Sequence, residues 1–216
     1  MKSVLITGGT VRLGMAIAKR LRAEGWRVIT SSHRADAGAD IVADLTESMG
    51  PAKLYAAVLR ILGGMPPDAL VNNAALFTGD AAAIGTVNLE APKKLTMLMA
   101  GRETGVGTVV NILDTKALDV YRHLSTPIDA YLASKRELRA FTLSSAATFA
   151  ATLRVNGVAP GPVMAPTDVH EKAGEMLLDR RPTADDVAAA VSYLLSAEAT
   201  TGTVVPVDAG QNLLRA

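Results

Sequence analysis

The sequence predicts one α/β domain, built on a doubly wound parallel sheet of about seven strands with helices on both faces. Short apolar runs rich in β-branched residues alternate with amphipathic helical segments along the whole chain. This order implies parallel strands joined by crossover helices. No linker, repeat or run of charge interrupts the 216 residues, so residues 1–216 are expected to form a single domain with a sizeable core.

The expected strands are the short apolar runs. In chain order they are Ser3–Ile6, Arg27–Thr30, Ile41–Ala43, Ala69–Val71, Gly107–Leu113, Arg154–Gly157 and Thr203–Val207. The first expected helix, Gly14–Glu24, carries Ile17 and Leu21 at helical spacing and ends before Gly25. The later helices are Pro51–Leu62, a long helix within Gly79–Gly101, Ile128–Ala151 and Ala184–Ser196.

The composition excludes several classes of function. The net charge of +1 gives no reason to expect binding to nucleic acid or to a membrane surface. The absence of cysteine excludes disulfides and thiolate metal sites, and His33, His123 and His170 lack metal-ligand spacing, so we expect no metal. The apolar part of the N-terminus is too short for a signal peptide or a membrane span. A cytoplasmic protein is the simplest interpretation.

The most specific motif is Tyr131-Leu-Ala-Ser-Lys135, in the fourth expected helix. Residues four apart share one face of a helix. A lysine ammonium beside a phenol stabilises the phenolate, so Lys135 is expected to lower the pKa of Tyr131 from about 10 and to make it a proton donor. Asp114 ends the fifth expected strand. A carboxylate there favours a protonated substrate nitrogen, and therefore reduction of C=N rather than C=O.

A glycine-rich turn, Thr7-Gly8-Gly9-Thr10-Val11-Arg12-Leu13-Gly14, joins the first strand to the first helix. Glycine permits a tight turn and lets the backbone approach a pyrophosphate held at the helix N-terminus. A turn of this kind is also compatible with a purely structural role, but its place at the start of a βαβ unit favours nucleotide binding.

Together these motifs resemble the short-chain dehydrogenase/reductase superfamily from end to end. Arg12-Leu13-Gly14, with Arg12 in place of the usual middle glycine, and Asp114 in place of the usual serine resemble its pteridine reductase and dihydromonapterin reductase branch. The resemblance implies a Rossmann-type fold and a nicotinamide cofactor. The residues that it assigns to the cofactor are Gly8, Thr10, Arg12, Leu13, Gly14, Ser32, His33, Arg34, Asp44, Leu45, Asn73, Ala74, Tyr131, Lys135, Pro160, Gly161 and Val163.

The choice of nicotinamide is expected to depend on Ser31-Ser32-His33-Arg34, at the end of the second strand. An acidic residue there would hold the ribose 2′-hydroxyl of NAD and repel a 2′-phosphate. Hydroxyl, imidazole and guanidinium groups suit a 2′-phosphate, so the sequence predicts NADPH/NADP⁺. Two alternatives remain: Asp36 as an NAD ligand, and a polar loop without a ligand.

The resemblance implies a catalytic set of Asn88, Asp114, Tyr131 and Lys135. Pro92 lacks an N–H, which frees the Asn88 carbonyl four residues earlier to hold a water of the proton relay. Lys135 would also hold the nicotinamide ribose. Asp114 has an alternative role as a strand-end cap, with Asp119 or Thr115 pointing into the site. Tyr131 follows Asp114 by 17 residues, which implies an insertion around Tyr121–Ser125.

The substrate is expected to contact Arg12, Phe77, Asp114 and Tyr131, with Phe77 stacking on a pterin and Met164–Pro182 forming a lid. Phe77 as a small hydrophobic plug is the alternative. The expected activity is NADPH-dependent hydride transfer to a pteridine-like C=N bond. The alternatives are a carbonyl or 3-oxoacyl reductase of the same fold, and a non-catalytic nucleotide-binding sensor or scaffold. Relatives pair through helices equivalent to Gly79–Gly101 and Ile128–Ala151, which implies a homodimer or homotetramer.

Overall fold

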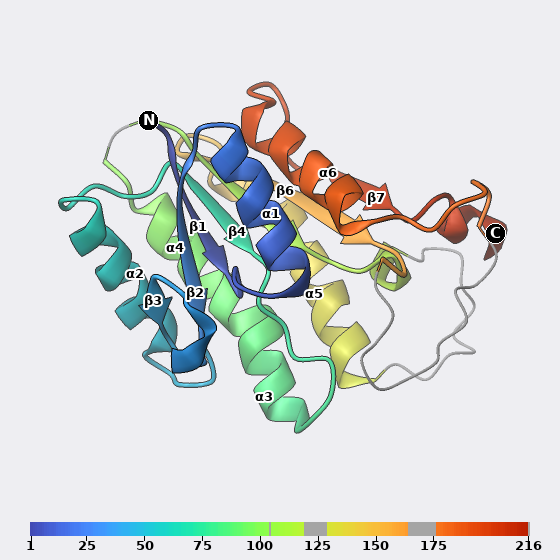
Figure 1. The fold of residues 1–216 in the computed structure, drawn as a ribbon, viewed down its shortest axis with the longest axis horizontal. Coiled ribbons are helices and arrows are strands. Elements are labelled where there is room, and N and C mark those ends of the chain that lie inside the picture. The colour runs from blue at the N-terminus through green and yellow to red at the C-terminus, as the bar shows by residue number, and fades with distance from the viewer. Residues whose placement is uncertain (104, 119–128, 164–175, 216) are drawn as a thin grey trace.

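The computed structural model, which describes residues 1–103, 105–118, 129–163 and 176–215, contains the predicted doubly wound sheet (Figure 1). Its seven strands are all parallel and lie in the order β3-β2-β1-β4-β5-β6-β7. Their bounds are β1 Ser3–Thr7, β2 Arg27–Ser32, β3 Ile41–Val42, β4 Ala69–Asn72, β5 Gly107–Ile112, β6 Leu153–Pro160 and β7 Val204–Val207. The strand order reverses between β1 and β4, and in such sheets ligands bind beyond the carboxyl ends at that point.

Helices cover both faces of the sheet, which confirms the predicted Rossmann-type arrangement (Figure 1). The α-helices are α1 Arg12–Ala23, α2 Gly50–Ile61, α3 Ala81–Gly85, α4 Ala91–Ala100, α5 Ala130–Thr148 and α6 Ala184–Ser196. Short helical turns are η1 Ala35–Ala37, η2 Thr86–Glu90, η3 Thr115–Leu118 and η4 Gln211–Arg215. Within these described ranges, no helix has the length and apolar character needed to cross a membrane.

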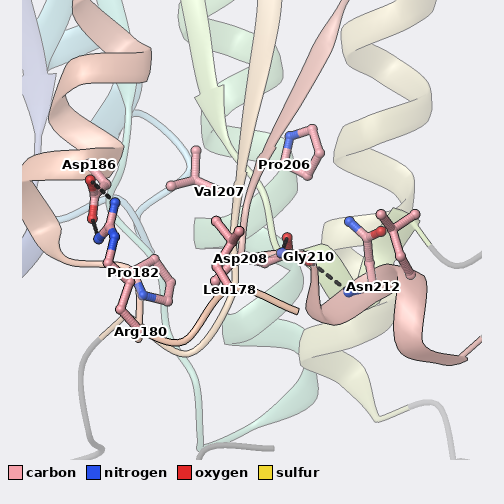
Figure 2. Close-up of a pocket in the computed structure, with 11 residues that line it drawn as sticks. Leu178, Arg180, Pro182, Asp186, Pro206, Val207, Asp208, Gly210 and Asn212 are labelled. Atoms are coloured by element: carbon pink, nitrogen blue, oxygen red, sulfur yellow. Dashed lines mark hydrogen bonds and ion pairs between the residues drawn. The ribbon is translucent and has the colours of Figure 1, made fainter. Parts of the chain in front are cut away.

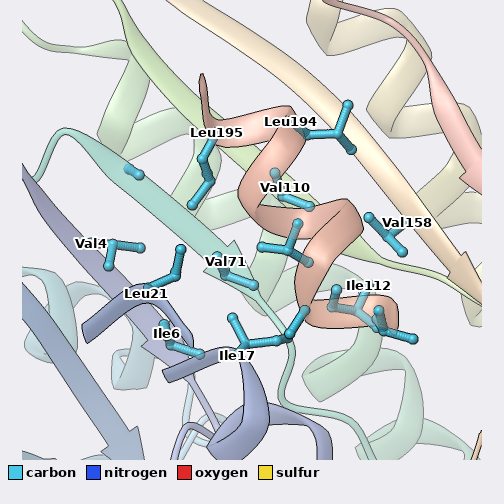
Figure 3. Packing of buried hydrophobic residues seen from close by; sticks show 14 of the residues in the cluster. Val4, Ile6, Ile17, Leu21, Val71, Val110, Ile112, Val158, Leu194 and Leu195 are labelled. Carbon is cyan, nitrogen blue, oxygen red and sulfur yellow. The ribbon is translucent and has the colours of Figure 1, made fainter. Parts of the chain in front are cut away.

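The core is divided between the two faces because side chains alternate along each strand. On one face, Val4, Ile6, Val71 and Val110 meet Ile17 and Leu21 of α1 and Leu194 and Leu195 of α6 (Figure 3). Their neighbours in the strands, Leu5, Leu70 and Val109, pack on the other face against Leu54 of α2 and Leu95 of α4. The two clusters fix the strands in register and hold their carboxyl ends as a rigid edge.

A long helical segment lies within Gly79–Gly101, as predicted, and it contains a π-helical turn that was not predicted. The helix α3, the π-helical turn η2 and the helix α4 follow one another without a gap, with Pro92 in the first turn of α4. In η2 the hydrogen bonds run five residues back, as when the Ala91 N–H donates to the Thr86 carbonyl. The turn therefore widens the helix where Asn88 lies. Another difference is that β6 continues to Pro160, three residues past the predicted end.

Candidate active site

The glycine-rich turn between β1 and α1 is held in shape by the residues that follow β4. The Asn73 side-chain amide donates to the carbonyls of Thr7 and Gly8, at 2.9 and 3.0 Å. The Thr7 hydroxyl accepts the backbone N–H groups of Asn73 and Ala74. Gly8 has a φ of +63°, and a Cβ on Gly14 would collide with the Gly8 carbonyl oxygen. The backbone of the turn is thereby fixed, with no room for a side chain at Gly14.

Arg12 adopts a φ of 47°, in the left-handed region that favours glycine. Its position is the one at which the resembling family carries a glycine, so the backbone keeps the glycine-like conformation although the residue differs. Helix α1 begins at this residue and has no acidic side chain in its first turn.

The Thr10 hydroxyl is buried and has no hydrogen-bond partner in the part of the chain that the structure describes. A buried hydroxyl normally has a partner. It lies in the turn that leads to the N-terminus of α1, whose first N–H groups have no intrahelical acceptor. These donors fit an anionic pyrophosphate, so the turn suits a nicotinamide dinucleotide.

At the end of β2, Arg34 is engaged by a neighbouring carboxylate. Its Nε and Nη2 donate to the two oxygens of Asp36 at 3.0 and 2.7 Å, and its backbone N–H donates to the Ser32 hydroxyl. The bond from Arg34 lowers the pKa of Asp36 below its usual value. Arg34 therefore forms an exposed ion pair with Asp36 beyond the carboxyl end of β2.

The end of β3 carries Asp44, whose carboxylate accepts both the backbone N–H and the hydroxyl of Thr46, at 2.8 and 2.7 Å. These hydrogen bonds lower the pKa of Asp44. Leu45 is buried in the core. A smaller electrostatic effect of His33 lowers the pKa of Asp44 further.

Asp114 follows β5 and serves two partners with its two carboxylate oxygens. Oδ1 accepts the backbone N–H of Lys116 at 2.8 Å, and Oδ2 accepts the Tyr131 hydroxyl at 3.0 Å. Asp114 thus caps the end of the strand and also accepts a hydrogen bond from Tyr131, while its catalytic role stays a prediction. Thr115, the alternative site residue, is buried in η3.

The prediction that Lys135 lowers the pKa of Tyr131 is wrong for this structure. Burial raises the Tyr131 pKa well above 10, and the Asp114 charge and hydrogen bond raise it further, as does the charge of Asp129. The Lys135 ammonium lies 5.7 Å from the centre of the Tyr131 ring and donates instead to the Ile112 carbonyl at 2.8 Å. Tyr131 is therefore a neutral phenol at working pH.

Lys135 is only 3% exposed, and its burial lowers its own pKa from 10.5 to about 8. The negative charge of Asp114 acts in the opposite direction and supports the ammonium form. Lys135 consequently holds a proton at neutral pH, although it gives that proton up more readily than an exposed lysine does.

Asn88 is fully buried and holds the loop before Phe77 through its side chain. Its Oδ1 accepts the Leu76 N–H at 2.7 Å, and its Nδ2 donates to the Leu76 carbonyl and to the Ser134 hydroxyl. The Ser134 hydroxyl in turn donates to the Tyr131 carbonyl at 2.6 Å. The predicted role of Asn88 concerned its backbone carbonyl; its side chain adds a link between this loop and α5.

Phe77 is 63% exposed, and its ring meets the Tyr131 ring edge-on, with centroids 4.8 Å apart and an interplanar angle of 62°. Such an exposed aromatic contact is not a core plug. Much of the phenyl ring is exposed beside the Tyr131 ring, and a flat ring could stack on it.

The end of β6 approaches the end of β7 closely. The Gly161 N–H donates to the Val207 carbonyl at 2.9 Å, and a Cβ on Gly161 would lie 2.6 Å from the Asp208 Cβ. Val163 bonds back to the Gly161 carbonyl. Pro160, Gly161 and Val163 therefore form a tight turn at the same edge of the sheet as Asp114.

Three residues that matter to this site were given no role in the sequence interpretation, although Thr7 and Ser134 lie within its motifs. Thr7 fixes the turn, Ser134 links Asn88 to α5, and Asp129 caps α5 by accepting the Leu132 N–H at 2.7 Å. Only Asp129 has a local signal, since an aspartate directly before a helix is a favoured N-cap. The predicted insertion Tyr121–Ser125, Asp119, His123, His170 and the lid from Met164 to residue 175 lie outside the described residues.

A cavity of about 410 Å³ opens beyond the carboxyl end of β7 (Figure 2). Its walls include Leu178, Pro206, Val207 and Leu213, and an ion pair joins Arg180 to Asp186 at its edge. Asp208 is occupied by the backbone N–H groups of Gly210 and Asn212. None of the predicted catalytic or cofactor residues lines this cavity. In the ranges that the structure describes, no cluster of three or more histidine, aspartate or glutamate residues could hold a metal ion.

Comparisons with known proteins show which family the sequence matches. The family described as short chain dehydrogenase matches residues 2–177. The NADP-dependent (R)-specific alcohol dehydrogenase of Lentilactobacillus kefiri is 29% identical, over 97% of this chain and 96% of that protein. Pteridine reductase 1 of Leishmania tarentolae is 28% identical, over 98% and 96%.

Solved structures of other proteins have a similar fold. The structure of FolM alternative dihydrofolate reductase 1 from Brucella canis, complexed with NADP, is similar with a TM-score of 0.83 and 28% identity, over 98% of this chain and 94% of that one. Other similar structures were determined with NADPH or with NADH.

Proposed function

Because the chain belongs to the short-chain dehydrogenase family of NAD(P)-dependent oxidoreductases, we propose that it is an NADPH-dependent reductase of a pteridine-like C=N bond, converting a dihydropteridine to a tetrahydropteridine. The observation that carries this proposal is the 3.0 Å hydrogen bond from the Tyr131 hydroxyl to Asp114. A carboxylate at that position suits a substrate nitrogen that becomes positively charged, whereas a carbonyl oxygen that becomes an oxyanion needs a neutral or positive donor.

The protein groups would handle the proton while the bound nicotinamide supplies the hydride. The hydride adds to the carbon of C=N, and one proton adds to the nitrogen, which leaves CH–NH. The Asp114 carboxylate would attract and hold the protonated nitrogen. Tyr131 has a raised pKa and keeps its proton, so it would donate a hydrogen bond and pass a proton only in concert with Asp114.

The remaining residues would bind and orient. Phe77 would stack on the heterocycle, because its exposed ring lies beside Tyr131. Lys135, positively charged at neutral pH, would bind the hydroxyls of the nicotinamide ribose and keep the Asp114–Tyr131 pair from carrying an unbalanced charge. Arg12, at the start of α1, would lie near the phosphates and the substrate.

NADPH is the proposed cofactor because hydroxyl and basic groups stand where an NAD-binding protein carries an acidic residue: Ser32 ends β2, and His33 and Arg34 follow it. The N-terminus of α1 and the Thr10 hydroxyl, which has no hydrogen-bond partner among the described residues, would hold its pyrophosphate. Support also comes from the FolM structure, which was determined with NADP.

Variants of Asp114 test the assignment. Asp114→Asn keeps an oxygen that can accept the Lys116 N–H, so it removes the charge with little effect on the local fold. We expect kcat/KM for a dihydropterin to fall by roughly 10²- to 10⁴-fold in Asp114→Asn, as for loss of an acid–base group, and equally in Asp114→Ser. The measurement is the initial rate of NADPH oxidation, with unfolding midpoints as the control for folding.

The same variants separate the alternatives. A carbonyl or 3-oxoacyl reductase is favoured if Asp114→Ser preserves or improves reduction of a ketone, as the similar alcohol dehydrogenase suggests. A non-catalytic nucleotide-binding role is favoured if NADPH binds and no pterin, ketone or 3-oxoacyl compound is reduced. Either result contradicts the pteridine proposal.

A further inference from the structure

The ion pair between Arg34 and Asp36 lies shortly after β2, in the segment proposed above to bind the 2′-phosphate of NADPH. It is bidentate, with Nε–Oδ1 and Nη2–Oδ2 distances of 3.0 and 2.7 Å. Both side chains are exposed, at 60% and 70%, so the pair lies at the surface that a nucleotide would approach. Asp36 is held close by η1, the short turn that begins directly after Arg34.

This geometry affects how Arg34 can bind an anion. A guanidinium recognises phosphate best through two parallel N–H groups, and Asp36 already accepts two such groups from Arg34. A phosphate would have to displace the carboxylate or share the cation with it. It would also be repelled by the negative charge of Asp36 a few ångströms away.

The other acidic groups near the ends of β2 and β3 have different partners. Asp40 accepts both the N–H and the hydroxyl of Thr30, and Asp44 accepts those of Thr46. A small electrostatic effect of His33 lowers the pKa of both Asp36 and Asp44. Among the described residues, the Arg34 side chain forms its hydrogen bonds and its ion pair with Asp36.

We propose that Asp36 is a specificity-determining residue that competes with the cofactor's 2′-phosphate for Arg34, so that the chain binds NADPH only moderately better than NADH. This rests on the proposed binding of NADPH near Arg34, and it assigns to Asp36 a role opposite to that of a ribose ligand for NAD. The ion pair weakens the affinity for the phosphorylated cofactor and leaves the affinity for the unphosphorylated one unchanged.

Direct binding tests this proposal without any substrate. NADPH and NADH are titrated into the wild-type protein, Asp36→Asn, Arg34→Met and the double variant, with nicotinamide fluorescence as the signal. One unit charge about 6 Å from a phosphate in watery surroundings changes affinity by about 3- to 10-fold. Asp36→Asn is therefore expected to tighten NADPH binding by that factor and to leave NADH within about twofold.

A double-mutant cycle and a matched control complete the design. If the carboxylate also competes for Arg34, removal of the Asp36 charge is expected to tighten NADPH binding more in the presence of Arg34 than in the Arg34→Met background, where only the direct repulsion of the phosphate is relieved. Glu103→Gln removes one exposed carboxylate near the amino end of β5, at the opposite edge of the sheet, and is expected to change neither affinity.

Each other outcome overturns the proposal. Unchanged or weaker NADPH binding by Asp36→Asn shows that the carboxylate does not compete. A selective loss of NADH affinity identifies Asp36 as a ribose ligand, and an equal gain for both cofactors indicates a general charge effect. These results do not depend on turnover, so they are distinguishable from failure of the pteridine reductase assay. Absence of binding by either cofactor overturns both proposals.

Discussion

The chemistry proposed for the site depends on the two different uses of the Asp114 carboxylate. One oxygen caps the backbone after β5, and the other accepts the Tyr131 hydroxyl. The cap fixes the carboxylate in place, so its second oxygen is presented to the site without loss of side-chain freedom on binding. A serine at the same position has one short hydroxyl and could not serve both partners in this way.

Lys135 is the residue at which stability and function are expected to conflict. Its burial lowers its pKa to about 8 from 10.5. Between these values the unfolded chain keeps the proton on Lys135 and the folded chain loses it, so this residue makes the wild-type protein more stable as pH rises through the window from 8 to 10.5. Below pH 8 the folded protein bears the full cost of the buried charge.

We therefore expect Lys135→Met to gain the most stability over the wild type near pH 7, where the wild type buries a charge. This gain in unfolding free energy should decrease by up to about 3 kcal/mol as pH rises towards 10.5. NADPH-dependent activity is expected to be lost at every pH. Urea denaturation at several pH values measures it. A difference that is constant with pH contradicts the assignment of a perturbed pKa to this lysine.

The element that limits variation most is the turn between β1 and α1. Gly14 has no room for a side chain, because a Cβ would meet the Gly8 carbonyl oxygen and the Asn73 side chain. Gly85, at the end of α3, has helical dihedral angles and nothing within 4 Å of an added Cβ. The same substitution, glycine to alanine, can therefore be compared at a crowded site, Gly14, and at an open site, Gly85.

Gly14→Ala is expected to destabilise the protein by roughly 1–3 kcal/mol and to weaken NADPH binding, because backbone atoms must move apart. Gly85→Ala is expected to stabilise it by about 0.5–1 kcal/mol, since alanine favours the helix and restricts the unfolded chain. Urea denaturation and NADPH titration measure both. Wild-type stability and cofactor affinity in Gly14→Ala would contradict the described turn.

The π-helical turn η2 shows why one element was not predicted. The sequence Gly79–Gly101 has the periodicity of a single helix. The π-helical turn occurs where Asn88 bonds to the backbone of Leu76, twelve residues away, and to Ser134, 46 residues away. Local propensity carries no information on such partners, so only Pro92 gave a sign that the helix changes there.

At the scale of the molecule, the alternation of strands and helices was sufficient to predict the sheet and its two helical layers. The positions of Asp114, Tyr131 and Lys135 also followed from pattern, because all three come from elements that meet at one edge of the sheet. The pKa shifts and ion pairs of the site could not be predicted from the sequence pattern. The raised pKa of Tyr131 depends on burial and on the approach of Asp114, and the Arg34–Asp36 pair depends on the turn η1.

The central claim is that this site reduces a pteridine-like C=N bond with NADPH. The most direct test is the steady-state oxidation of NADPH by the wild-type protein with dihydromonapterin or dihydrobiopterin, set beside a panel of small ketones and 3-oxoacyl compounds at matched concentrations. We predict a kcat/KM for the dihydropterin at least about tenfold above that for any ketone. Turnover of a ketone without turnover of any pterin would contradict the claim.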